Sequence, residues 1–344
     1  MVTDRVEHRA ARYTQAALCG AAVVVGLLVL WFGSQAFLLA FAGVLFAIGL
    51  RSGAGWVGRV TGLSPGYALA LTVLVLAAAL GVFVYVAGQR VAEEFDQLRE
   101  DLPQAWAHAQ GQLNRFAWGR DLLSDVPSAG QLLTGGNHMG GVFSAFSTAL
   151  SALGSVVVTG FLALYFAASP QMYRRGFLRL IPDHRRKETG AVLDRTGEQL
   201  RRWLLGKLAL MCFVGIATAV GLWLLHVPLV LPLAVLAALL DFIPNVGPIL
   251  SAIPAVLLAT EQGFTTALWV ALVYLAVQVL ESYILQPLVQ QQNVSLPPAL
   301  TLLGQILFGT FFGLLGLVLA TPLTVVVLTV TQSVLEAQDV AEAG

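Results

Sequence analysis

Apolar runs about as long as a membrane is thick recur along this chain, and they dictate what it can fold into. A helix needs roughly 20 apolar residues to cross a hydrocarbon core about 30 Å thick. The runs cover residues 16–32, 36–50, 66–87, 149–168, 208–226, 229–260, 264–280 and 299–331. In lipid only helices and closed barrels satisfy the backbone hydrogen bonds, and these runs lack the alternation of barrel strands. The sequence therefore predicts an all-α, polytopic helical membrane protein with about eight transmembrane segments.

The composition agrees with a membrane setting and argues against several classes of function. The 344 residues are 57% hydrophobic and 11% charged, with a formal net charge of +0, whereas soluble domains average about 25% charged residues. A chain without a basic surplus gives no electrostatic reason to expect a nucleic-acid partner. The sequence also contains no metal-ligand spacing and no hydrolase or nucleotide-binding motif. We therefore expect no enzyme activity, no catalytic residues, no resident metal and no cofactor.

Lysine and arginine residues are distributed unevenly between the loops, and this distribution predicts the orientation. They number three before residue 16, two in residues 51–65, four in residues 88–145 and ten in residues 170–207. Basic residues accumulate on the cytoplasmic side of membrane proteins. The N-terminus and residues 170–207 are therefore expected to be cytoplasmic, and residues 88–145 extracytoplasmic. The first apolar run is expected to be a membrane helix and not a cleaved signal.

These assignments divide the chain into six regions. They are an N-terminal three-helix membrane region at 1–87, an extracytoplasmic amphipathic helical segment at 88–145, a fourth membrane helix at 146–169, a basic cytoplasmic segment at 170–207, a C-terminal membrane region at 208–335 and a tail at 336–344. The basic segment is expected to contact anionic lipid headgroups of the bilayer.

The extracytoplasmic segment carries its own pattern. Apolar residues recur every three or four positions from Val91 to Phe116, which predicts a long amphipathic helix. Such a helix either lies on the membrane, contacts a neighbouring subunit or caps its own bundle. The second possibility predicts a homo-oligomer.

Residues 241–254, with the sequence DFIPNVGPILSAIP, interrupt an apolar run with polar residues and prolines. The apolar halves on either side are too short to span a membrane alone, and prolines and glycine favour a break in the helix. Non-helical backbone at membrane depth persists only where protein or a water-filled cavity satisfies it. We interpret the break as part of a substrate or ion pathway; a proline kink capped by Asp241 is the alternative. The candidate residues are Asp241, Pro244, Asn245, Gly247, Pro248, Ser251 and Pro254.

A second element, residues 296–323, has a similar outline. Its apolar halves are interrupted by glycines, and a proline lies toward its end. Paired interrupted segments are typical of transporter repeats, so we interpret the two elements as broken or re-entrant hairpins that face one site. The candidate residues of this second broken element are Gly309, Gly313, Gly316 and Pro322.

Two polar residues between these elements, Gln278 and Glu281, lie three positions apart and share one helix face. A charged side chain at membrane depth costs about 2.5–3.5 kcal/mol on insertion scales and needs a partner, water or a proton. No lysine or arginine follows Lys207. Asp241 or Glu281 is therefore expected to carry a proton, which is the chemistry of proton coupling. In the alternative interpretation, Glu281 lies in water at the membrane interface.

The segments LDFIPNVGPILSAIPAVLLA, VQVLESYILQPLV and SLPPALTLLGQILFGTFFGLLGLVLATPL resemble the AI-2E family of transporters, and the resemblance covers most of residues 10–335. It implies a multi-pass protein of the bacterial inner membrane. It also implies export of a small solute similar to autoinducer-2, which we expect to be coupled to protons. Because family members are also assigned exchange of cations for protons, a Na⁺(Li⁺)/H⁺ antiporter is the alternative. A non-transporting membrane scaffold is the alternative from another class.

Overall fold

Helices form all the regular secondary structure in the part of the chain that the computed structural model describes. The described residues are 33–79, 155–290 and 298–342, with isolated positions between residues 81 and 111. The apolar run at 16–32 lies outside them, and so do nearly all of the extracytoplasmic segment and its expected amphipathic helix. Within the described ranges the expected all-α class is confirmed.

Four helices within these ranges are long and apolar enough to cross a membrane, and a bent pair of helices would make a fifth crossing. The four are Ser34–Thr61, Asp183–Leu224, Phe264–Leu288 and Ala299–Glu336, and the pair is Ser155–Ala168 with Pro170–Arg179. Three shorter apolar helices span Pro65–Ala79, Val230–Leu240 and Val246–Glu261. The protein is therefore a multi-pass membrane protein, and the expected total of about eight segments stays a prediction.

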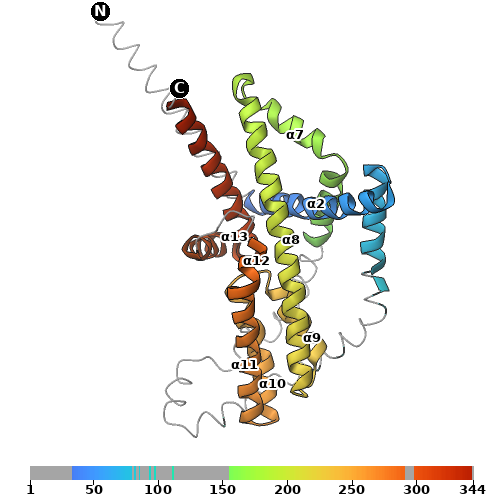
Figure 1. The fold of residues 1–344 in the computed structure, drawn as a ribbon, viewed down its shortest axis with the longest axis vertical. Helices are drawn as coiled ribbons and strands as arrows, with labels where there is room; N and C mark the ends of the chain where they lie inside the picture. Colours follow the sequence, from blue (N-terminus) through green and yellow to red (C-terminus); the bar gives the residue numbers. More distant parts are fainter. Residues whose placement is uncertain are drawn as a thin grey trace, which may run out of the picture.

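The central element is α8 (Arg186–Leu224), an unbroken helix of 39 residues. At 1.5 Å per residue it is about 58 Å long, nearly twice the thickness of a hydrocarbon core of about 30 Å. In Figure 1 it runs along the long axis of the molecule and is crossed by α2 (Ser34–Thr61). Helices α9 (Val230–Leu240), α11 (Phe264–Leu280) and α13 (Pro298–Glu342) also pack against it.

Helices α9 and α10 (Val246–Glu261) form an antiparallel hairpin, which we call the first hairpin. Leu233 of α9 packs with Ala255 and Leu258 of α10 in one buried cluster, so the two helices run back along each other. The cluster also includes Leu222 of α8. The hairpin turns at residues 241–245, where the sequence predicts the break.

Helix α13 is also folded back on itself, because Gly313 has the non-helical angles φ 63° and ψ −149°. The two arms lie against each other. A Cβ atom on Gly304 would come within 2.7 Å of Thr324 Oγ1, and one on Gly316 within 2.1 Å of the Phe308 carbonyl oxygen. We call this element the second hairpin. Both interrupted segments are thus helical hairpins, and their re-entry into a membrane stays a prediction.

A second buried cluster joins α2, α8 and the outgoing arm of α13. Leu45, Trp203 and Leu319 are among its members, and the Phe242 ring at the tip of the first hairpin meets the Trp203 ring edge-on with centroids 5.8 Å apart. Outside the clusters, large apolar side chains such as Trp223 are exposed. Apolar surface of this extent needs lipid or another protein to cover it.

Candidate functional site

A cluster of three buried charged side chains lies at the tip of the first hairpin. Lys207 Nζ donates a hydrogen bond of 2.9 Å to Asp241 Oδ2 and lies 3.5 Å from Glu281 Oε1. The exposed fractions of the Lys207, Asp241 and Glu281 side chains are 7%, 1% and 8%. A buried charge is tolerated only when it is paired and hydrogen-bonded, so these three residues form one electrostatic unit, which we call the charge cluster.

Each member of the charge cluster comes from a different element. Lys207 lies within α8, and Asp241 directly follows the last residue of α9. Glu281 begins a π-helical turn, Glu281–Leu285, between α11 and α12 (Gln286–Gln290). Single π turns within α-helices are frequent at functional sites. The first hairpin therefore meets α8 and the end of α11 through charged side chains.

Sequence reasoning missed Lys207, which it placed at the end of the basic cytoplasmic segment. In the structure α8 continues through this position, and Lys207 lies on the same buried stripe as Leu200, Trp203, Leu204 and Leu210. The signal was present, because steps of three and four from Leu200 lead to residue 207 and mark a helix face that is otherwise apolar. Lys207 of α8 thus supplies the basic partner that residues 208–344 lack.

The charges in the cluster do not cancel when both carboxyl groups are ionised. One ammonium then faces two carboxylates, which leaves a net charge of minus one in a buried site. Asp241 Oδ1 and Glu281 Oε2 are also buried and have no hydrogen-bond partner among the described residues. One proton or one monovalent cation would neutralise the cluster and bind these oxygens.

The turn of the first hairpin depends on two residues with unusual backbone requirements. Asn245 has φ 65° and ψ −42°, close to the strained classic γ-turn, and the Val246 N–H closes this turn by donating to the Pro244 carbonyl at 2.8 Å. A Cβ atom on Gly247 would lie 1.8 Å from the Leu240 carbonyl oxygen, so only glycine fits where α10 meets the end of α9. The Gly247 N–H donates to the Ile243 carbonyl at 2.9 Å and closes the turn.

The prolines and the serine of the break serve the hairpin in different ways. Pro248 lies in the first turn of α10, where a missing N–H costs nothing. The hydroxyl of Ser251, 1% exposed, donates to the Pro248 carbonyl at 3.0 Å. Pro254 lies inside α10, beyond the tip. The simple kink considered for this segment is wrong for the described structure, because the chain reverses direction there.

The two hairpins touch through Pro244. Its carbonyl oxygen accepts a 2.8 Å hydrogen bond from Gln305 Nε2, in the first arm of the second hairpin. Gln305 is 3% exposed, and its Oε1 atom has no partner among the described residues. Sequence reasoning did not select Gln305, although it is a lone amide in the apolar run LTLLGQILFG. The two broken elements thus contact each other at this bond, and that they face one site stays a prediction.

The remaining predicted residues add no charged side chain to the cluster. Gln278 donates to Ser282 Oγ at 3.1 Å within its own helical segment. Gly309 and Gly316 line the contact between the arms of the second hairpin, and a Cβ atom on Gly309 would meet Leu317 at 3.6 Å. Pro322 is fully buried in the outgoing arm. Gly309, Gly316 and Pro322 thus shape the second hairpin, whereas Asp241 and Glu281 carry the charge of the cluster.

Comparison with known proteins gives one family. Residues 21–336 match the family model described as AI-2E family transporter. YueF of Bacillus subtilis, provisionally named a transport protein, is 29% identical over 172 residues, or 50% of this chain and 47% of YueF. A transport protein of Thermotoga maritima, also provisionally named, is 24% identical over 238 residues, or 68% of each chain.

One relative has a more specific name. The AI-2 transport protein TqsA of Escherichia coli is 28% identical over 152 residues, or 44% of each chain. The chain spans about half the length of the first Bacillus relatives that it matches, 47% in both YueF and YrrI.

Proposed function

Because this chain belongs to the AI-2E transporter family, we propose that it is a secondary transporter that exports a small solute and couples the movement to protons. The charge cluster of Lys207, Asp241 and Glu281 supports this proposal best. It is buried, it joins three elements, and it is neutral only when it has taken up one positive charge. A site whose charge balance depends on one proton suits a protein that exchanges protons across a membrane.

The cargo we propose is a small polar solute similar to autoinducer-2. The name of the Escherichia coli relative supports this choice. The polar backbone at the tip of the first hairpin, beside the buried amide of Gln305, suits hydroxyl and carbonyl groups. The membrane we propose is the bacterial inner membrane, with the N-terminus and the basic segment at 170–207 in the cytoplasm.

The path we propose for the proton runs from the charge cluster along the contact between α8 and α11. A Cβ atom on Gly221 of α8 would meet Val273 of α11 at 2.4 Å, so the two helices are close beyond the cluster. The hydroxyl groups of Thr218 and Tyr274, in this part of the two helices, are buried and have no hydrogen-bond partner among the described residues. Hydroxyl groups both donate and accept, and can therefore take part in a proton path, in which water must bridge the roughly 16 Å along α8 from Lys207 to Thr218.

A second candidate function is exchange of Na⁺ or Li⁺ for protons. The observation that favours it is the set of buried oxygens without partners, Asp241 Oδ1, Glu281 Oε2 and Gln305 Oε1. Carboxylate and amide oxygens are the ligands that hard cations prefer. A monovalent cation would balance the charge cluster as a proton does, so the two could compete for it.

The test is flux in proteoliposomes that contain the full chain, under an imposed pH gradient. Glu281→Gln leaves Lys207 and Asp241 as a neutral pair that has no need of a further charge. We expect this variant and Asp241→Asn to insert normally and to lose flux driven by the pH gradient. Glu261→Gln is the matched control, because Glu261 is an exposed carboxylate at the end of α10. Full flux in both cluster variants would remove the coupling role.

The same assay separates the candidate cargoes. Replacement of Na⁺ by choline abolishes flux if the protein is a cation antiporter and leaves export of a labelled solute unchanged if it is a solute exporter. A non-transporting scaffold would give no flux for any member of a panel of solutes and cations, in the wild type as in the variants.

A further inference from the structure

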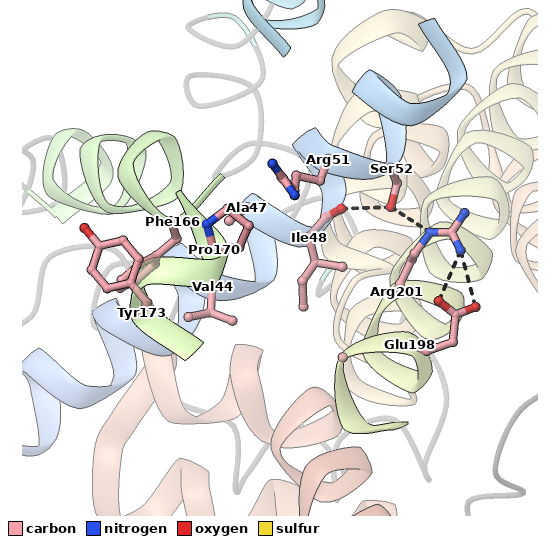
Figure 2. Close-up of a pocket in the computed structure, with 11 residues that line it drawn as sticks. Val44, Ala47, Ile48, Arg51, Ser52, Phe166, Pro170, Tyr173, Glu198 and Arg201 are labelled. Atoms are coloured by element: carbon pink, nitrogen blue, oxygen red, sulfur yellow. Dashed lines mark hydrogen bonds and ion pairs between the residues drawn. The ribbon is translucent and has the colours of Figure 1, made fainter. Parts of the chain in front are cut away.

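A cavity separate from the charge cluster lies between α2, α7 (Pro170–Arg179) and α8. Its volume is about 520 Å³, within the range of about 300–1,000 Å³ for pockets that bind small molecules. Figure 2 shows Arg51 from α2 and Arg201 from α8 at its margin, with Val44, Ile48 and Phe166 nearby. The lining thus combines an apolar wall with two guanidinium groups.

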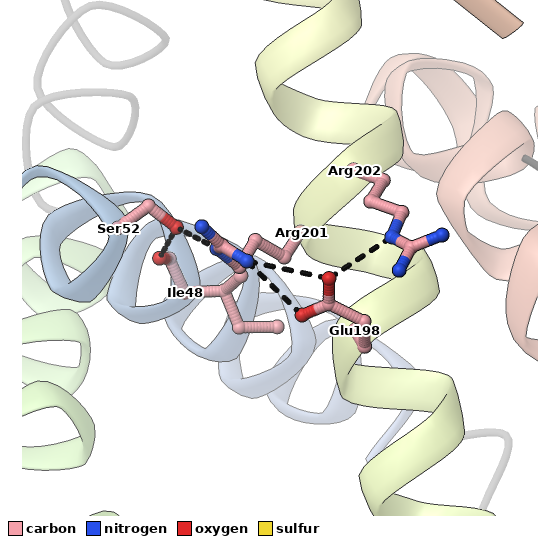
Figure 3. Close-up of polar contacts among 5 residues, drawn as sticks. All are labelled: Ile48, Ser52, Glu198, Arg201 and Arg202. Atoms are coloured by element: carbon pink, nitrogen blue, oxygen red, sulfur yellow. Dashed lines mark hydrogen bonds and ion pairs between the residues drawn. The ribbon is translucent and has the colours of Figure 1, made fainter. Parts of the chain in front are cut away.

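The polar side of the cavity has a surplus of positive charge. Arg201 Nε donates to Ser52 Oγ at 3.1 Å, and Arg201 Nη1 lies 3.2 Å from a carboxylate oxygen of Glu198. Glu198 also accepts from Arg202 Nε at 2.9 Å, as Figure 3 shows. The single acidic side chain of the lining is therefore shared between two arginines.

Arg51 has a different environment. Its Nε donates to the Ala167 carbonyl oxygen at 2.9 Å, a neutral acceptor. Among the described residues no carboxylate lies within ion-pair distance of Arg51. Within the described part of the chain its charge is uncompensated, and the remaining N–H groups of the guanidinium are available there to a ligand with several acceptor oxygens.

The surroundings indicate that this cavity opens at the level of lipid headgroups. The chain turns by 87° between the apolar helix Ser155–Ala168 and α7. Helix α7 carries Arg174, Arg175 and Arg179, and exposes Met172 and Phe177. A short helix with basic and apolar side chains, set at a right angle to an apolar helix, is typical of an interfacial position.

We propose that this cavity binds an anionic phospholipid, with the guanidinium groups of Arg51 and Arg201 on the phosphate and an acyl chain along Val44, Ile48 and Phe166. The two terminal nitrogens of Arg51 can match phosphate oxygens in a bidentate geometry, whereas Arg201, bound to Ser52 and Glu198 through Nε and Nη1, adds its Nη2 group. The surplus of one positive charge selects an anionic headgroup over a zwitterionic one. The apolar wall favours a lipid over a free phosphate ion, because the ion has no acyl chain to pack against it.

The experiment measures lipid binding to the full chain in detergent by native mass spectrometry, with phosphatidylglycerol and phosphatidylcholine as probes. The wild type is expected to retain phosphatidylglycerol in preference to phosphatidylcholine. Arg51→Gln should weaken phosphatidylglycerol binding about fivefold, the effect expected for one basic residue near an anionic surface. Arg51→Lys keeps the charge but loses the forked guanidinium group. Its affinity for phosphatidylglycerol should lie between those of the wild type and Arg51→Gln.

The matched control is Arg59→Gln on the same helix. Arg59 is exposed, donates to the Gly55 carbonyl at 3.2 Å and does not line the cavity. It should bind phosphatidylglycerol as the wild type does. The proposal is overturned if Arg51→Gln behaves like Arg59→Gln, or if phosphatidylcholine binds as well as phosphatidylglycerol. Displacement of the lipid by an equal concentration of inorganic phosphate would identify a free-anion site and overturn the lipid assignment.

Arg201→Gln adds a second, independent variant. Because Arg201 also bonds Ser52 and Glu198, its loss could disturb the contact between α2 and α8, and size-exclusion chromatography is run first. If Arg201→Gln is folded, its phosphatidylglycerol binding should fall as in Arg51→Gln, and unchanged binding would contradict its role. If it is not folded, Arg51→Gln and Arg51→Lys decide the proposal without it.

Discussion

The side-chain amide of Gln305 donates a hydrogen bond of 2.8 Å to the backbone carbonyl of Pro244, and this bond ties the second hairpin to the tip of the first. Pro244 is three residues from Asp241 in the charge cluster. A movement of the second hairpin is therefore transmitted to the turn that holds a cluster carboxylate. Through this contact, both interrupted segments act on the position of the same turn.

We predict that Gln305→Leu uncouples the two hairpins. The substitution removes one of two donors to the Pro244 carbonyl, which keeps a bond of 2.8 Å from the Val246 N–H, so we expect a cost of about 0.5–1.5 kcal/mol of unfolding free energy, the net value of one hydrogen bond. Thermal unfolding in detergent should show the loss of stability, and proteoliposome flux should fall more than protein yield. Gln262→Leu is the control, because its amide also donates to a backbone carbonyl, that of His226 at 3.0 Å, but in an exposed position outside the predicted site. Equal flux in the two variants would contradict the uncoupling.

The charge cluster should respond to removal of its cation more strongly than to removal of one anion. Lys207→Met leaves two buried carboxylates without a counter-charge, and loss of one partner from a buried ion pair costs about 3–5 kcal/mol. The triple variant Lys207→Met, Asp241→Asn, Glu281→Gln carries no charge at all, and should recover most of that stability. Denaturant unfolding measures the free energy of unfolding of Lys207→Met and of the triple variant.

Flux separates stability from function in the same series. The triple variant should be stable and inactive, because it has no group left that takes up a proton. A triple variant that is less stable than Lys207→Met would show that the cost comes from lost packing and not from uncompensated charge. Restored flux in the triple variant would argue against a role of the cluster in coupling.

Gly247→Ala should be the most damaging small substitution in the first hairpin. Its new Cβ atom would lie 1.8 Å from the Leu240 carbonyl oxygen, so the turn must open and the cluster must lose Asp241. We expect a cost above about 3 kcal/mol, at the upper end for overpacked sites. Gly55→Ala in α2 is the control: no atom lies within 4 Å of its added methyl group, and alanine in a helix gains about 0.5–1 kcal/mol. Thermal midpoints of the two variants compare them directly.

Gly313→Ala tests the turn of the second hairpin through the backbone alone. The position has open space around it but a φ of 63°, and a residue with a Cβ atom in such a strained region costs about 1–3 kcal/mol. Unfolding measurements should show a loss of this size. A neutral result would mean that the arms of α13 can turn with another backbone geometry.

The exposed ion pair between Arg195 and Glu336 should matter little. Its oxygen and nitrogen lie 2.6 Å apart, but both side chains are more than half exposed, and surface pairs contribute about 0–1 kcal/mol. Glu336→Gln should change the free energy of unfolding by less than about 1 kcal/mol, and high salt should remove even that difference. A larger effect would indicate that the pair holds the end of α13 against α8.

The sequence was sufficient for features that reside in local chemistry. Long apolar runs predict helices, and prolines and glycines at residues 241–254 predict the break, because each acts on its own stretch of backbone. The same reasoning located Asp241 and Glu281 as carboxylates that need a partner. The need follows from the cost of burial, which is a property of each residue type.

The sequence was insufficient where the answer depends on which helices meet. Lys207 lies 34 residues before Asp241 and 74 before Glu281, and only the packing of α8 against the first hairpin and α11 brings them together. Its basic neighbours in sequence masked its place on the buried face. Gln305 was overlooked for a similar reason, since a single amide in an apolar arm gains meaning only when the opposing carbonyl of Pro244 is known.

The continuity of α8 sets the mechanical character of the protein. Arg201 of the cavity and Lys207 of the charge cluster lie six residues apart on one unbroken helix, about 9 Å along its axis. Because the helix has no break between these two residues, a tilt of α8 at the membrane surface also moves Lys207 in the ion-pair site. The composition of the surrounding leaflet would thereby set how firmly the lysine holds its two acidic partners.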